Sequence, residues 1–82
     1  MKEIVVTKGT SEFLISRDEL SAVDEAPDGI VFHLKTNMFL HFTDQWMPQD
    51  VKQKIIVSVN TFGKGTVYIN LNDYKNVVRL EA

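Results

Sequence analysis

The sequence predicts an α+β domain in which six or seven short strands form a mostly antiparallel, bent sheet or small open barrel, with one helix over about residues 48–62. Three observations predict it. Residues 30–42 have the alternating pattern of a β-hairpin, short β-branched segments separated by turn residues recur along the chain, and one segment after Pro48 has helical spacing. With 82 residues, the chain is expected to form a single small domain, 1–82.

Three short strands precede the hairpin, and we expect them at residues 3–7, 12–16 and 21–25. A turn around Gly9 joins the first two, and Leu20 points inward from a tight turn before the third. The segment Ala-Pro-Asp-Gly at 26–29 predicts another turn, because proline presets its own backbone angle and glycine accepts a positive one.

The register of the central hairpin follows from which residues share a face. A three-residue loop over 35–37 places six large apolar side chains on one face in opposed pairs: Leu34–Met38, Phe32–Leu40 and Ile30–Phe42. A two-residue loop would break that agreement. Asn37 suits the left-handed position that ends a three-residue loop.

The single helix is expected to begin at Pro48, whose missing N–H has no helical partner at the first position. Gly63 is a suitable stop. Polar residues, Lys52 among them, fall on the surface, whereas the apolar residues recur at helical spacing: Val51, Ile55, Val59 and Phe62.

An alternative for part of this segment is a strand, because residues 55–59 are rich in β-branched side chains. Such a strand would pair across a turn at 63–65 with the strand that we expect at 66–71. The polar run before Ile55 favours the helix. A turn at 72–76 and a final strand at 77–81 complete the chain.

Composition excludes several classes of protein. The absence of cysteine rules out disulfides and thiolate metal sites and fits a reducing compartment. No long apolar run is present, so we expect a soluble cytoplasmic protein without membrane insertion. The net charge of −2, without a dense basic stripe, disfavours nucleic acid as a partner.

Catalytic motifs are missing as well. His33 and His41 are the two histidines of the chain, and two ligands do not make a metal site. There is no Gly-x-Ser-x-Gly segment, and the Gly-Lys-Gly-Thr segment at 63–66 lacks the spacing of a phosphate-binding loop. We therefore expect no enzyme and no catalytic, cofactor or metal site.

An interaction surface is the positive expectation. The hairpin face opposite the core carries Val31, His33, Phe39 and His41, where a solvent face would carry Lys, Glu and Thr. Trp46 is a candidate binding anchor, although a tryptophan that fills the core at the strand–helix junction is the preferred interpretation.

The functional prediction is a non-enzymatic protein-interaction or regulatory module with an unidentified protein partner. Two copies could also pack on this face about a twofold axis, with Phe39 as anchor, in a contact that weakens below about pH 6.5 as the histidines gain charge. The alternative is a small β-rich single-stranded nucleic-acid-binding domain that stacks bases on aromatic side chains beside lysines: Phe39, Tyr68 or Tyr74, and Lys64 and Lys75.

Over about residues 12–57 the chain resembles the small flagellar FlbD/SwrD-like proteins. The resemblance rests on a strand, an inward Leu20 turn, an acidic stretch with Pro-Asp, and a strand that ends in a Thr-Asn turn, at residues 12–15, 18–20, 23–30 and 34–37. It implies a following helix and a flagellar role. The chain departs from the family in its strands from Thr66 onward and in having no glycine after Asn37, and its length also suits a small phage-encoded or mobile-element protein.

Overall fold

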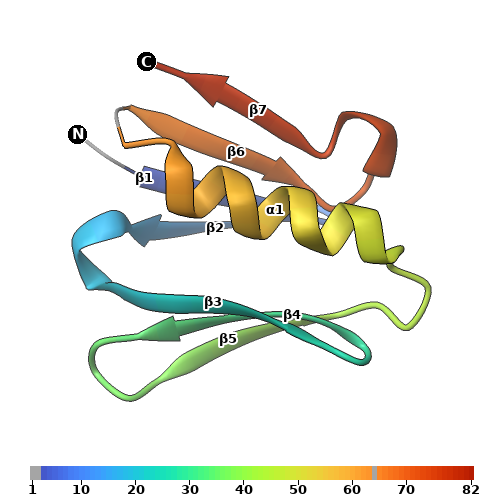
Figure 1. Ribbon diagram of the computed structural model, residues 1–82, viewed down its shortest axis with the longest axis horizontal. Coiled ribbons are helices and arrows are strands. Elements are labelled where there is room, and N and C mark those ends of the chain that lie inside the picture. The colour runs from blue at the N-terminus through green and yellow to red at the C-terminus, as the bar shows by residue number, and fades with distance from the viewer. Residues whose placement is uncertain (1–2, 64) are drawn as a thin grey trace.

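The computed structural model describes residues 3–63 and 65–82, in which seven strands form two sheets beside one α-helix (Figure 1). This confirms the predicted α+β class with short, mostly antiparallel strands. The strands divide into two open sheets, of four and three strands, which we call sheet A and sheet B.

Sheet A brings together residues from both ends of the chain. Its strands are β1 (Glu3–Lys8), β2 (Ser11–Ser16), β6 (Thr66–Asn70) and β7 (Val78–Glu81), in the order β2–β1–β6–β7. The first two form the predicted hairpin, with Lys8 opposite Ser11. β1 and β6 run parallel, which is possible because all of sheet B and the helix lie between them in the sequence.

Sheet B contains the hairpin that the apolar pattern predicted. Its strands are β3 (Leu20–Ala26), β4 (Gly29–Leu34) and β5 (Phe39–Thr43), in sequence order. The predicted register is confirmed, with Ile30 opposite Phe42 and Phe32 opposite Leu40. The Leu34 N–H donates to the Met38 carbonyl oxygen at 2.8 Å, and Asn37 has the expected positive φ of 68°.

The turn between β3 and β4 depends on Gly29. Its φ is 146°, and a Cβ atom at this position would lie 2.0 Å from the Phe42 carbonyl oxygen. Only glycine fits so close to the neighbouring strand, which explains the Pro-Asp-Gly signal in the sequence.

The helix α1 (Gln49–Thr61) confirms the helical interpretation and excludes the strand alternative for residues 55–59. Pro48 immediately precedes it, as expected. Ile55 and Val59 are fully buried, because their spacing places them on one face. Near the end of the helix, a guanidinium N–H of Arg17 donates to the Val59 carbonyl oxygen, where the helix dipole favours a cation.

The core lies between the two sheets and α1, which packs against β3, β6 and β7. The Phe42 ring meets Phe32 of the same sheet at 5.7 Å and Phe13 of β2 at 5.1 Å, edge to face in both cases. These contacts connect sheet B to sheet A. Met38, at the tip of the hairpin, is 67% exposed, so the core ends before the turn.

Candidate functional site

One face of sheet B points away from the core, and we call it the outer face of sheet B. The registers place its side chains in three cross-strand rows: Ala22–His33–Phe39, Asp24–Val31–His41 and Ala26–Gly29–Thr43. Within residues 3–63 and 65–82, no helix or strand covers this face, since α1 and sheet A lie on the opposite side of sheet B (Figure 1). A three-strand surface that combines apolar residues with His33, His41, Asp24 and Thr43 is therefore left open.

Four of the five residues that the sequence singled out for a partner share this face. Phe39 protrudes most, with 62% of its surface exposed, and its ring centroid lies 6.4 Å from that of His33. Val31 lies half-buried in the neighbouring row, directly opposite His41. The hairpin register thus brings these residues together as predicted.

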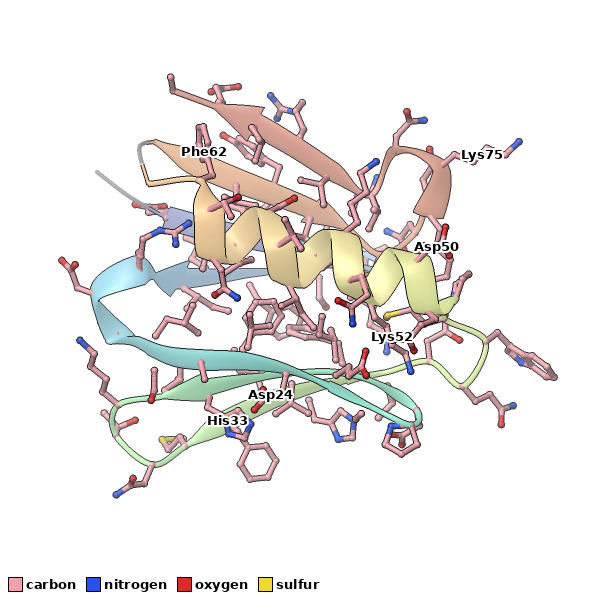
Figure 2. All side chains as sticks on the ribbon, viewed as in Figure 1. Asp24, His33, Asp50, Lys52, Phe62 and Lys75 are labelled. Atoms are coloured by element: carbon pink, nitrogen blue, oxygen red, sulfur yellow. The ribbon has the colours of Figure 1, made fainter. Side chains whose placement is uncertain are left out.

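Each histidine on the outer face has a carboxylate partner. His33 Nε2 lies 3.2 Å from Asp24 Oδ2 (Figure 2), and His41 Nε2 lies 3.1 Å from Asp28 Oδ1. Both pairs are solvent-exposed, so each contributes at most about 1 kcal/mol when the imidazole is protonated. The hairpin pattern did not indicate these aspartates as partners of the histidines, although the predicted turn at 26–29 already fixes Asp24 opposite Val31.

A hollow of about 350 Å³ lies beside the His33–Asp24 pair, at the hairpin end of sheet B. Apolar and polar groups both line it, including Ala22, Met38 and Asn37. The outer face of sheet B therefore carries a protruding aromatic ring next to a concave region.

Trp46 does not fill the core, and the preferred interpretation of this residue was wrong. It is 79% exposed, whereas its neighbour Met47 is 6% exposed and takes the core position. The cause is a tight turn after β5, in which the backbone N–H groups of Trp46 and Met47 donate to the side chain and carbonyl of Asp44. Trp46 lies outside the three rows of the outer face of sheet B.

The same Asp44 accepts a hydrogen bond from the Tyr74 hydroxyl, which joins the end of β5 to the short helical turn before β7. This contact and the Trp46 N–H hold the pKa of Asp44 below its usual value. Burial and the Asp44 carboxylate raise the pKa of Tyr74 to about 12. The Tyr74 hydroxyl is thus a protonated, fixed donor rather than a free group.

Lys52 was expected on the surface of the helix, but it is 6% exposed. Its ammonium group donates to the carbonyl oxygens of Ala26 at 2.6 Å and Pro27 at 3.4 Å, which fixes α1 to the turn between β3 and β4 (Figure 2). Glu25 adds hydrogen bonds from the side chains of Gln49 and Gln53. Spacing alone could not reveal this, because the acceptors come from another part of the fold.

The aromatic residues named for base stacking do not gather on one surface. The Tyr68 ring is covered by the Arg79 guanidinium, 3.9 Å from the ring centroid, and the Tyr74 hydroxyl is bound to Asp44. Lys75 and His33, the neighbour of Phe39, lie at opposite sides of the molecule (Figure 2). Lys64 lies outside the described residues.

Among the described residues, no group of three or more His, Asp or Glu side chains is placed to hold a metal ion. In the same part of the chain, no helix is long and apolar enough to span a bilayer.

Neither the protein-family models nor the curated proteins and solved structures with which the chain was compared gives a match.

Proposed function

We propose that this chain is a non-enzymatic protein-interaction module that uses the outer face of sheet B as its contact surface. The observation that carries the proposal is Phe39, 62% exposed on a three-stranded face that no other described element covers. An exposed antiparallel face normally carries polar residues, whereas this one carries Ala22, Val31 and Phe39 along its cross-strand rows.

The partner that fits this face is a second copy of the chain. A twofold interface needs one surface that is complementary to itself. The protruding Phe39 and the adjacent hollow of about 350 Å³ supply a projection and a recess on one face. Each histidine of this face already lies beside an aspartate of the same chain, at 3.2 Å for His33 and 3.1 Å for His41, so a second copy need not supply partners for the two imidazoles.

In this proposal the chain acts by assembly, in the manner of a small regulatory protein. The resemblance to flagellar FlbD/SwrD-like proteins supports such a setting. A phage-encoded or mobile-element protein that binds a host component is the other setting that its size suits.

Light scattering of the wild type and of Phe39→Asp at neutral pH tests the proposal. We expect the mass of the wild-type assembly to fall by half in Phe39→Asp, because a carboxylate would be buried without a partner. Leu14→Asp is the matched control, since Leu14 has a similar exposure of 67% but lies on sheet A. A monomeric wild type at high concentration, or equal masses for wild type and Phe39→Asp, would overturn the proposal.

A further inference from the structure

The strand β7 is an edge of sheet A with one hydrogen-bonded neighbour, β6. The two edge strands of sheet B, β3 and β5, have contacts along their edges. The Lys8 ammonium donates to the Thr43 carbonyl oxygen at the end of β5, and α1 packs along β3 with Lys52 bound to the Ala26 carbonyl. Although α1 contacts β7, no hydrogen bond among the described residues engages the outer backbone groups of this strand, and Figure 1 shows it at the outer limit of its sheet.

The hydrogen-bond pattern shows which backbone groups of β7 face outward. The Asn70 N–H donates to the Val77 carbonyl oxygen, so even-numbered residues of β6 bond to β7. Consistently, the Leu71 N–H bonds to Thr7 of β1 on the other side. By the alternation of antiparallel pairs, Arg79 bonds to Tyr68, whereas Val78 and Leu80 direct their N–H and C=O groups away from the sheet.

The side chains of β7 are complementary to themselves when two such strands run antiparallel. With Leu80 opposite Leu80 of a second copy, Arg79 faces Glu81 of that copy, and Glu81 faces its Arg79. Shifting the register by two residues sets Arg79 against Arg79 or Glu81 against Glu81, which is unfavourable. A shift of one residue places bonded backbone groups opposite free ones.

We infer that β7 pairs with β7 of a second copy about a twofold axis at Leu80, which joins two copies of sheet A into one continuous eight-stranded sheet. The outward N–H and C=O of the two Leu80 residues bond to each other, and the Leu80 side chains, each 49% exposed, meet at the axis. Arg79 and Glu81, which already form an ion pair at 2.5 Å within one chain, then form a four-residue cross-strand charge cluster. This interface is separate from the outer face of sheet B.

A charge-swap series in the Phe39→Asp background, in which the sheet B contact is disabled, tests the inference by sedimentation at several concentrations. We expect Phe39→Asp alone to be a dimer. Adding Arg79→Glu or Glu81→Arg should weaken that dimer about tenfold or more, because two attractive pairs become repulsive. Combining both charge changes restores opposite charges and should restore the dimer.

A backbone variant checks the same interface without altering charge. Leu80→Pro removes an N–H that β6 does not use, so the fold should survive, as circular dichroism would show, while the β7 dimer is lost. A monomeric Phe39→Asp protein at high concentration, or a dimer that Arg79→Glu and Leu80→Pro leave unchanged, would overturn the inference. Loss of assembly by Arg79→Glu alone, without any effect of Phe39→Asp, would support the β7 interface and refute the sheet B proposal.

Discussion

Both faces of the β4–β5 hairpin carry phenylalanine, but the surroundings of the two faces are opposite. On the inner face, Ile30 and Phe32 are fully buried and Phe42 is 5% exposed. The residues of the outer face alternate with these along each strand, and one of them, Phe39, is 62% exposed. Because alternate residues of a strand point to opposite sides, Phe32 and Phe42 lie in the core whereas Phe39 lies in solvent.

Because one face is buried and the other exposed, we expect substitutions on the two faces to affect different properties of the protein. The inner face is held by α1 and sheet A, and its aromatic rings interlock edge to face. The outer face has only exposed His–Asp pairs to stabilise it, and these add little free energy. Substitutions on the inner face are therefore expected to unfold the protein, whereas those on the outer face are expected to alter assembly.

The largest effect is expected for Phe32→Ala, which removes a fully buried ring. We expect the free energy of unfolding to fall by about 3–5 kcal/mol, measured by urea denaturation. Phe39→Ala, on the other face of the same hairpin, should cost less than about 1 kcal/mol under conditions where the protein is monomeric. Equal losses of unfolding free energy in Phe32→Ala and Phe39→Ala would show that the two faces contribute equally to stability, contrary to this expectation.

Lys52→Ala tests whether the polar contact between α1 and sheet B supports the inner face. The variant removes a donor from the carbonyl oxygens of Ala26 and Pro27, and we expect a loss of about 1–3 kcal/mol in the same measurement. The neighbouring Lys54→Ala is the control, because Lys54 is exposed and should change stability by less than about 0.5 kcal/mol. Similar values for both lysines would contradict the role of Lys52.

Tyr74→Phe should lower the free energy of unfolding at neutral pH, by less than Lys52→Ala does, because Asp44 loses its hydroxyl donor. The pKa of Tyr74 is raised to about 12 from its ordinary value of 10.0, so the folded state holds this proton more tightly than the unfolded state. The advantage of the wild type is therefore complete from neutral pH up to about pH 10 and shrinks as pH rises toward 12, whereas in acid it falls as Asp44 takes up a proton. A difference between the two proteins that stays constant over this window would refute the contact.

The smallest effect concerns the His–Asp pairs of the outer face of sheet B. Asp24→Asn removes the carboxylate that lies 3.2 Å from His33. Because this pair is solvent-exposed, we expect the dissociation constant of the sheet B contact to change by less than about fivefold at neutral pH, followed by light scattering. A larger change would show that the pair takes part in the contact directly. Asp18→Asn, an exposed acid before β3, is the control and should behave like the wild type.

Sequence patterns predicted the parts of the fold that depend on local spacing. The hairpin register followed from six apolar residues and Asn37, and the start of α1 followed from Pro48. The parallel pairing of β1 with β6 could not be foreseen, because it joins segments about sixty residues apart that carry no mutual signal.

Trp46 and Lys52 show that sequence spacing does not determine the burial of every single residue. Trp46 and Met47 are adjacent, and the turn at Asp44 decides which of them enters the core. Lys52 is buried because two carbonyl oxygens of a distant turn receive its ammonium group. In contrast, the part of the outer face of sheet B that β4 and β5 provide was predictable, since Val31, His33, Phe39 and His41 follow from the alternation of one hairpin.

If the outer face of sheet B is the contact surface, amide chemical shifts over a dilution series will report it residue by residue. The measurement uses Arg79→Glu, so that the β7 edge does not contribute. With rising concentration, we expect the amide signals of Val31, His33, Phe39 and His41 to move together, while that of Leu14 on sheet A stays fixed. Shifts confined to sheet A, or no shifts at concentrations where light scattering detects assembly, would contradict the claim.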